Sequence, residues 1–272
     1  MLDKVYHLKA ELSKFSSVLI AFSGGTDSTF LLKVCTEIFG SRCVAVTVDA
    51  EIIHRREVSN AKETSRSLGS NHVVIPQNVL SKPEIASNPP ERCYYCKKVI
   101  FNNLLNIAEK YNCDAVLDGT NVDDFSDYRP GIKALSELGI VSPLKDAGLS
   151  KQEIRHVSAH HGLSNWNMPS NSCLATRFPY GDWITSEKLR QVEEAEDILL
   201  SLGFEQLRVR HHGTIARIEV PEDCFDRFLR EPLRNKVVND IKSLGFSFIT
   251  LDLRGFRSGS MNEVLYNREE QR

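Results

Sequence analysis

The feature that most constrains the fold is a glycine-containing turn near the start of the chain, between an apolar run and a helix-forming segment. The apolar run covers residues 17–22, the turn Ser-Gly-Gly-Thr-Asp-Ser covers residues 23–28, and helix-forming residues follow. The adjacent Gly24 and Gly25 let the backbone turn tightly and bring N–H groups close to a ligand. The next helix adds unpaired N–H donors and the positive end of its dipole. This order predicts a strand, a phosphate-binding loop and a helix.

This turn is not a Walker A loop, because it lacks the Gly-Lys-Ser/Thr ending and has no lysine for the phosphates. It resembles the SGGxDS signature of the PP-loop ATP pyrophosphatases, which split ATP into AMP and pyrophosphate. The alternative is an ordinary glycine turn before a helix. We expect ATP here, with its pyrophosphate held by backbone N–H groups and hydroxyls of Ser23, Gly24, Gly25, Thr26, Ser28 and Thr29.

A carboxylate in the same loop predicts a magnesium ligand. Asp27 cannot favourably face bare phosphate, whereas Mg²⁺ bridges carboxylate and phosphate oxygens. The alternative for Asp27 is a helix N-terminal carboxylate that stabilises the helix dipole. Asp49 and Gly119, each at the end of a later apolar run, are expected to flank the adenosine or to be turn residues.

Strand-like and helix-like segments alternate along the first part of the chain, which predicts a parallel sheet with helices on both faces. Ligands of such sheets bind beyond the carboxyl ends of the strands. The phosphate loop, Asp49 and residues 118–121 are therefore expected on one rim. The expected strands are residues 18–22, 43–49, 72–75, 115–118 and 139–142, and the helices between them are residues 28–39, 55–68, 97–110 and 150–161.

The pattern is interrupted twice and changes after Gly181. Proline-containing segments at residues 78–92 and 165–181 are expected to be irregular, and such insertions are often functional. Beyond Gly181 the order helix, strand, strand, helix, strand predicts a small α+β domain with an antiparallel sheet. We therefore expect an α/β PP-loop domain at residues 1–180 with a doubly wound parallel sheet, and a smaller α+β domain at residues 181–272 that serves substrate binding or oligomerisation.

Composition excludes several classes of protein. The 272 residues are 41% hydrophobic and 26% charged, as in ordinary globular domains. The formal net charge of −2 gives no basic field for a nucleic acid, so no nucleic-acid partner is expected. No apolar run reaches membrane-spanning length and no leader opens the chain, so we expect a cytoplasmic protein with no membrane partner. Seven cysteines without a leader argue against a disulfide framework.

Three of the cysteines form a pattern that suits more than one chemistry. Cys93 and Cys96 form a CxxC motif that leads into a helix, and Cys173 stands alone in the second proline-containing segment. Structural zinc normally takes four ligands, and no second paired motif lies nearby. A redox pair needs no remote third thiol. Three cysteines also fit a [4Fe–4S] cluster with one open iron.

Several motifs together resemble the LarE-type sulfur transferases, which make the nickel-pincer nucleotide cofactor. The motifs are SGGTDS, RCYYCK, DGTNVDD followed by RPG, PSNSCLATRFPYG, LRVRHHGTIARIEV and RGFRSGSMNE, and they cover nearly the whole chain. The resemblance implies an AMP-forming ATP pyrophosphatase that adenylates a carboxylate of pyridinium-3,5-biscarboxylic acid mononucleotide and then makes a thiocarboxylate. It also implies a homo-oligomer, with six subunits in family members.

The resemblance implies two sources of the sulfur. In one branch of the family the cysteine matching Cys173 gives up its own sulfur and becomes dehydroalanine. In the other, cysteines matching Cys93, Cys96 and Cys173 hold a [4Fe–4S] cluster with an extra sulfide. This chain has all three, so the cluster branch is expected.

Arginines are the candidates for binding the anionic groups of such a substrate. Arg129 and Arg177 suit a phosphate or carboxylate, and Arg208, Arg210, Arg254 and Arg257 suit a 5′-phosphate, with Glu196 orienting one of them. The alternative for each arginine is a solvated surface or an ion pair. The rival functions are a cluster-dependent tRNA thiolation enzyme, which is disfavoured because acidic residues outnumber basic ones by 36 to 34, and a module that binds ATP without splitting it.

Overall fold

The computed structural model describes residues 2–125, 130–169, 171–257 and 259–262. The chain divides into two compact units, the first formed by residues 1–85 and 90–171, the second by residues 86–89 and 172–272. None of the helices in the described residues is both long enough and apolar enough to span a membrane.

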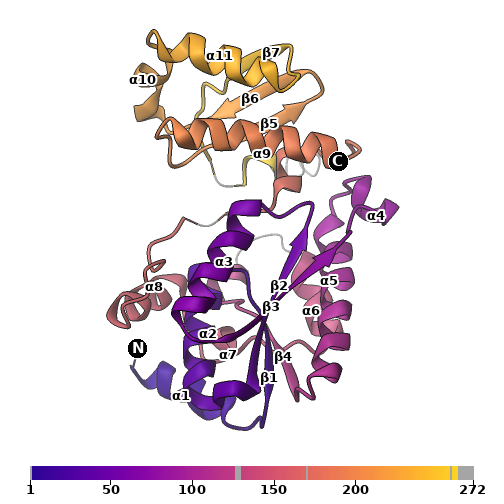
Figure 1. The fold of residues 1–272 in the computed structure, drawn as a ribbon, viewed down its shortest axis with the longest axis vertical. Coiled ribbons are helices and arrows are strands. Elements are labelled where there is room, and N and C mark those ends of the chain that lie inside the picture. Colours follow the sequence, from indigo (N-terminus) through magenta and orange to yellow (C-terminus); the bar gives the residue numbers. More distant parts are fainter. Residues whose placement is uncertain (1, 126–129, 170, 258, 263–272) are drawn as a thin grey trace, which may run out of the picture. The chain divides into compact units, whose positions relative to one another are not determined.

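The first unit is built on a four-stranded parallel sheet, as the alternating pattern predicted. Its strand order is β3-β2-β1-β4, and every neighbouring pair runs parallel (Figure 1). The strands are β1 (Val18–Ala21), β2 (Cys43–Ala50), β3 (Asn71–Gln77) and β4 (Ala115–Leu117). The predicted fifth strand is reduced to one parallel bridge between Val141 and Leu117.

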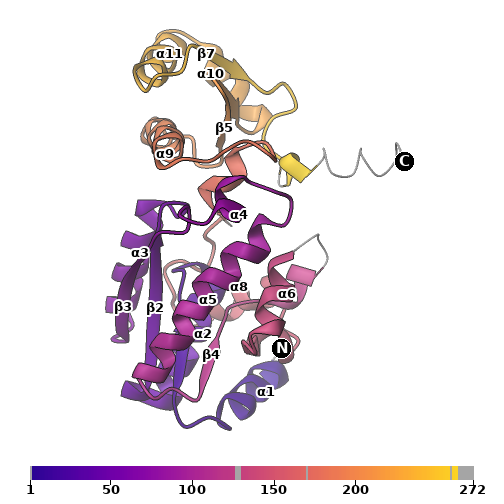
Figure 2. The ribbon, with the colours of Figure 1, turned by 90° about the vertical axis from the view of Figure 1, so that its right-hand side faces the viewer.

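Helices cover both faces of this sheet. Figures 1 and 2 show α2 and α3 on one face and α5 and α6 on the other. Their bounds, with those of the remaining helices of this unit, are α1 (Leu2–Leu12), α2 (Thr26–Phe39), α3 (Arg55–Ser67), α4 (Pro83–Ala86), α5 (Arg92–Lys110), α6 (Pro130–Glu137), α7 (Pro143–Asp146) and α8 (Lys151–His160). Buried side chains of α1, α2, α8 and the first two strands form one apolar core, including Leu8, Phe30 and Ile20. That core fixes the start of α2, and with it the phosphate loop.

The second unit is the smaller α+β body that the sequence predicted. Helices α9 (Ser186–Ser201) and α11 (Leu233–Ser243) pack side by side on one face of a three-stranded sheet (Figure 2). The strands are β5 (Arg208–His212), β6 (Ile215–Glu219) and β7 (Phe248–Leu251), in the order β5-β6-β7. The prediction of an antiparallel sheet is wrong for one pair: β5 and β6 form an antiparallel hairpin, but β7 runs parallel to β6. The helical connection through α10 (Phe225–Leu229) and α11 brings the chain back so that β7 starts at the same end as β6.

Candidate functional site

The phosphate loop joins β1 to α2 and is closed by its own hydroxyls. The backbone N–H of Gly25 donates to Ser23 Oγ at 3.3 Å, and the Oγ atoms of Ser23 and Ser28 lie 3.0 Å apart. Ser28 Oγ also donates to the carbonyl of Gly25 at 3.1 Å. Helix α2 begins at Thr26, so its first N–H groups and positive dipole end belong to this loop. The loop thus combines hydroxyls with the end of a helix, a combination suited to polyphosphate.

Two glycines at this site are required by close packing. Gly24 has φ +75°, and a Cβ there would lie 2.9 Å from the Cα of Ala61 on α3. A Cβ on Gly119, just after β4, would lie 3.1 Å from the backbone nitrogen of Ser28. Gly119 therefore lets the end of β4 approach the first turn of α2, so its place in the site has a steric reason.

Asp27 is the acidic residue in the first turn of α2, and its carboxylate is poorly satisfied. Oδ2 lies 3.5 Å from Lys151 Nζ and accepts a 3.3 Å hydrogen bond from Asn121 Nδ2. Oδ1 is buried and has no hydrogen-bond partner among the described residues. Burial raises the pKa of Asp27, and the positive charge of Lys151 opposes the rise. A buried carboxylate oxygen without a partner is a suitable hard ligand for a cation, so Asp27 fits the expected magnesium ion.

Two residues that no sequence motif identified, Asn165 and Lys151, contact this region. Thr26 Oγ1 donates to the backbone carbonyl of Asn165 at 2.8 Å, so this hydroxyl proton is used within the protein. Asn165 lies at the start of the second proline-containing segment. Its side-chain amide donates a hydrogen bond to the phosphate loop. Lys151, next to Asp27, follows the N-cap of α8. No spacing in the sequence identifies either residue, because both reach the loop through tertiary contacts.

The rim predicted from the parallel order contains one exposed and one buried carboxylate. Asp49 is exposed near the end of β2. Asp118 follows β4 and is only 5% exposed, and its carboxylate accepts hydrogen bonds from Ser142 Oγ at 2.6 Å and from Thr120. Asp118 thus holds the loop after β4 in shape, whereas Asp49 is open to a ligand.

The CxxC motif lies inside α5 rather than ahead of it. The helix begins at Arg92, five residues before the predicted start at Lys97, so Cys93 and Cys96 are separated by about one helical turn. Cys93 is exposed, Cys96 is buried, and Arg92 Nη2 lies 3.9 Å from Cys93 Sγ. The pair therefore presents one solvent-facing thiol beside a guanidinium.

Cys173 belongs to the second unit, in a loop held by Arg177. Its backbone carbonyl accepts hydrogen bonds from Thr176 N–H at 3.0 Å, Thr176 Oγ1 at 2.8 Å and Arg177 Nη1 at 3.2 Å. Arg177 Nη1 also donates to the carbonyl of Ser172 at 2.8 Å. Among the described residues no disulfide forms, and no three His, Cys, Asp or Glu side chains gather as a ready metal site. Cys93 and Cys96 belong to the first unit and Cys173 to the second.

Arg177 is itself fixed by a buried carboxylate. Arg177 and Glu196 are both 0% exposed, and the guanidinium donates two 2.9 Å hydrogen bonds to the two carboxylate oxygens. Glu196 Oε1 also accepts from the backbone N–H of Val209 at 2.9 Å. Glu196 therefore orients Arg177, which was not among the four arginines expected for it, and the pair ties the Cys173 loop to β5.

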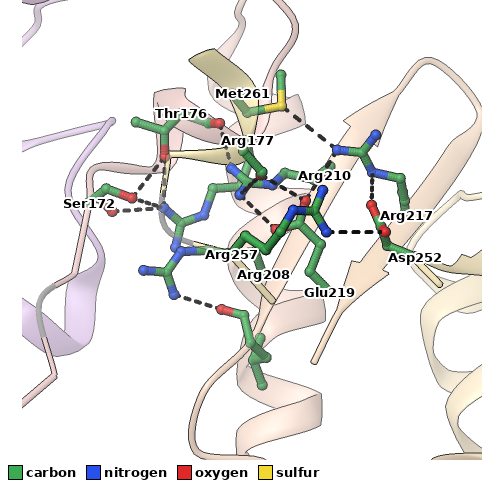
Figure 3. A network of polar contacts seen from close by, with 12 residues as sticks. Ser172, Thr176, Arg177, Arg208, Arg210, Arg217, Glu219, Asp252, Arg257 and Met261 are labelled. Atoms are coloured by element: carbon green, nitrogen blue, oxygen red, sulfur yellow. Dashed lines mark hydrogen bonds and ion pairs between the residues drawn. The ribbon is translucent and has the colours of Figure 1, made fainter. Parts of the chain in front are cut away.

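Several other arginines of the second unit, among them Arg210, Arg217 and Arg257, lie in a network of polar contacts around the strands (Figure 3). Arg210 donates to Glu219 at 2.7 Å and to the carbonyl of Thr176 at 2.9 Å. Arg257 lies 3.6 Å from Asp252 and donates to the carbonyl of Gly255 at 3.0 Å. Arg254 is exposed, and Arg129 lies outside the described residues.

Arg208 is a buried cation close to the other arginines of this network. Its guanidinium lies 5.1 Å from the centre of the Phe256 ring and donates to the carbonyl of Leu207 at 2.6 Å. Burial, together with the positive charges of Arg177 and Arg210, lowers its pKa to about 10. The carboxylates of Glu196 and Glu219 oppose this lowering of the pKa.

The parallel sheet, with the SGGTDS loop at its carboxyl edge, defines the first unit as a PP-loop domain. Comparison with known proteins agrees. The chain is 41% identical over 259 residues to a pyridinium-3,5-bisthiocarboxylic acid mononucleotide synthase of Lactiplantibacillus plantarum, covering 95% of this chain and 93% of that protein. It is 38% identical over 263 residues to an uncharacterised protein of Synechocystis, covering 97% and 98%. One component of the glutamine-hydrolysing GMP synthase of Archaeoglobus fulgidus is 25% identical over 203 residues, covering 70% and 66%.

The chain belongs to the LarE-type sulfur transferase family of the PP-loop superfamily, as the motifs predicted. A comparison with models of known protein families found no match.

Proposed function

We propose that this protein is an ATP-dependent sulfur transferase that acts on pyridinium-3,5-biscarboxylic acid mononucleotide. A substrate carboxylate oxygen attacks the α-phosphorus of ATP, the bond to the β-phosphate breaks, and pyrophosphate leaves. A sulfur nucleophile then attacks the acyl carbon of the adenylate and AMP leaves, which yields the thiocarboxylate. The observation that carries this proposal is the phosphate loop at the carboxyl edge of the sheet, together with the 41% identity to a synthase of the bisthiocarboxylic acid mononucleotide.

The first unit is proposed to bind ATP. The N–H groups at the start of α2, including that of Thr26, bind the pyrophosphate together with the hydroxyls of Ser23 and Thr29. The hydroxyl of Ser28 joins them when it releases the carbonyl of Gly25. Asp27 would hold Mg²⁺, which neutralises charge on the phosphates. Asp49 is proposed to contact the adenosine, while Gly119 holds the end of β4 against the loop.

The second unit is proposed to bind the mononucleotide through Arg208, with Arg210 and Arg257 beside it. The buried Arg208, with its lowered pKa, supports this assignment because a phosphate would add to the negative charge that Glu196 and Glu219 already supply. Arg177 and Glu196 are proposed to position the Cys173 loop, since the hydrogen bonds of Arg177 go to that loop and to Glu196. We propose in addition that the protein assembles as a homo-oligomer.

The sulfur is proposed to come from a sulfide on a [4Fe–4S] cluster. Cys93, Cys96 and Cys173 would hold three irons, and the open fourth iron would supply bound sulfide as the nucleophile. The alternative is that Cys173 attacks the adenylate directly, after which elimination breaks its Cβ–S bond and leaves dehydroalanine. Cys173 serves in both routes, whereas Cys93 and Cys96 serve only in the first.

The experiment that separates the routes is mass spectrometry of Cys173 after one turnover of protein purified without oxygen. We expect thiolated product with an intact Cys173 thiol, and loss of iron and of sulfur transfer in Cys93→Ala and Cys96→Ala while pyrophosphate release continues. Cys224→Ala is the matched control and is expected to keep both activities. A residue 173 lighter by H₂S would contradict the cluster route, and absence of pyrophosphate release in wild type would contradict adenylation.

A further inference from the structure

The side chain of Asn165 holds the backbone of the phosphate loop and the first turn of α2 from outside. Its Nδ2 donates to the carbonyl of Gly24 at 2.9 Å and to Thr29 Oγ1 at 2.8 Å. Its backbone carbonyl accepts the 2.8 Å hydrogen bond from Thr26 Oγ1. Three residues of the loop and first helical turn are thus bound to one residue that follows them by 136 to 141 positions.

The orientation of the amide indicates that its donors matter more than its acceptor. Both hydrogens of Nδ2 are used, while Asn165 Oδ1 is buried and has no hydrogen-bond partner among the described residues. The reversed amide would place a carbonyl oxygen against the carbonyl of Gly24, which is repulsive. An unsatisfied buried acceptor costs free energy, so this arrangement favours holding Gly24 and Thr29 over satisfying Oδ1.

The contact also determines where the hydroxyl proton of Thr29 goes. Because Thr29 Oγ1 accepts from Asn165, its own proton must point elsewhere, and no described residue accepts it. Thr29 is fully buried in the first turn of α2, beside the loop's N–H groups. Because Thr29 has no exposed surface, a phosphate oxygen can accept this proton only when binding displaces the groups that cover the hydroxyl. No hydrogen bond donated by the hydroxyl to another described residue has to break for that.

We propose that Asn165 is a positioning residue for polyphosphate binding: it holds the Gly24 carbonyl in place and orients the Thr29 hydroxyl towards the phosphates. This inference rests on the ATP site of the proposed function. Asn165 itself does not touch the nucleotide in this arrangement. It acts through Thr29 and the loop backbone, so its removal weakens binding of phosphates and not of the nucleoside.

The test is the affinity of Asn165→Ala for inorganic pyrophosphate, Mg·ATP and adenosine, measured by calorimetry. We expect roughly tenfold weaker binding of pyrophosphate and ATP, because the Gly24 carbonyl and the Thr29 hydroxyl lose the hydrogen bonds that hold them in place. Adenosine binding should stay within twofold of wild type. Asn167→Ala, an exposed asparagine two residues away, is the matched control and is expected to bind all three ligands as wild type does. Equal weakening for adenosine, or no weakening for pyrophosphate, would overturn the inference.

A double-mutant cycle with Thr29→Val distinguishes positioning from general loosening of the fold. If Asn165 acts through the Thr29 hydroxyl, Asn165→Ala should weaken pyrophosphate binding much less in the Thr29→Val background than alone. Identical effects of Asn165→Ala in both backgrounds would contradict this.

Should Asn165→Ala fail to fold, Thr29→Ser and Thr29→Val test the hydroxyl directly. Thr29→Ser is expected to bind pyrophosphate like wild type and Thr29→Val about tenfold more weakly. Equal affinities of these two variants would overturn the role of the hydroxyl. If wild type binds neither ATP nor pyrophosphate, the proposed function fails together with this inference.

Discussion

The charged carboxylate of Asp27 is stabilised less by the fold than that of a surface aspartate would be. This is typical of a residue that binds a ligand. One of its carboxylate oxygens is buried without a partner among the described residues, and burial raises its pKa. A raised pKa means that the protonated, neutral form suits the folded state better than the charged one. At neutral pH the charged carboxylate therefore costs stability, which a bound cation would offset.

We predict that Asp27→Asn lowers pyrophosphate release at least tenfold, because the amide cannot supply the charge that holds Mg²⁺. The same variant should unfold at a higher temperature than wild type at pH 7. The amide resembles protonated aspartate, whose stabilising effect is present below the ordinary pKa of 3.8 and lost as the pH rises through the raised value. The difference in unfolding temperature between Asp27→Asn and wild type should therefore shrink as the pH falls towards 3.8.

The measurements for Asp27→Asn are a pyrophosphate assay and thermal unfolding at several pH values. Asp226→Asn is the control, because Asp226 is 91% exposed and should change neither quantity. Wild-type pyrophosphate release in Asp27→Asn would show that Asp27 serves only as a helix N-terminal carboxylate. A lower unfolding temperature would contradict the argument from burial.

At the scale of elements, helix α8 is fixed at its start by a capping box that reaches to α1. Ser150 Oγ accepts from Glu153 N–H, and the Glu153 carboxylate accepts from Ser150 N–H. Lys4 Nζ lies 2.8 Å from both oxygens of Glu153. The hydrogen bond from Lys4, and after it that from Ser150 N–H, lowers the pKa of Glu153 to about 2. This contact holds α8, the helix that precedes Asn165.

We predict that Glu153→Gln lowers the free energy of unfolding by about 0.5–1 kcal/mol at pH 7, a range that allows for solvent screening of the Lys4 pair. The lowered pKa of Glu153 gives stability that is present above the unfolded value of 4.5 and lost as the pH falls to about 2. Denaturant unfolding across this range should show the two proteins converging. Glu205→Gln, in an exposed loop, should behave as wild type throughout, and a constant difference down to pH 2 would contradict the assignment to charge.

At the scale of the whole molecule, we propose that the first unit binds ATP and the second binds the pyridinium mononucleotide. We predict that Arg208→Ala weakens binding of the mononucleotide about tenfold or more, since charge-assisted hydrogen bonds are worth roughly 1.5–3 kcal/mol. Its ATP affinity should stay within twofold of wild type. Calorimetry with each ligand separately measures both affinities, and Arg234→Ala, at an exposed position of α11, is the control. Loss of ATP affinity in Arg208→Ala would contradict the division between units.

The local patterns predicted much of the fold because each depends on neighbouring residues. The apolar run before Ser23 and the double glycine predicted β1, the loop and the start of α2, and the alternating pattern predicted the parallel sheet. The direction of β7 was not predictable, since a strand of four residues has the same side-chain pattern whether it pairs parallel or antiparallel. The early start of α5 was missed because Pro89 and Pro90 suggested that the irregular segment continued to Arg92.

The sequence by itself determined the family, the phosphate loop and the candidate thiols, because motifs record which chemical groups are present and how they are spaced along the chain. Only the tertiary structure decided which groups those residues meet. It paired Glu196 with Arg177, left Asp27 Oδ1 buried without a partner among the described residues, and joined Asn165 to Gly24 and Thr29. These contacts join residues 19 to 141 positions apart, and hydrogen bonds of 2.8–2.9 Å at such separations arise from packing, which no local periodicity encodes.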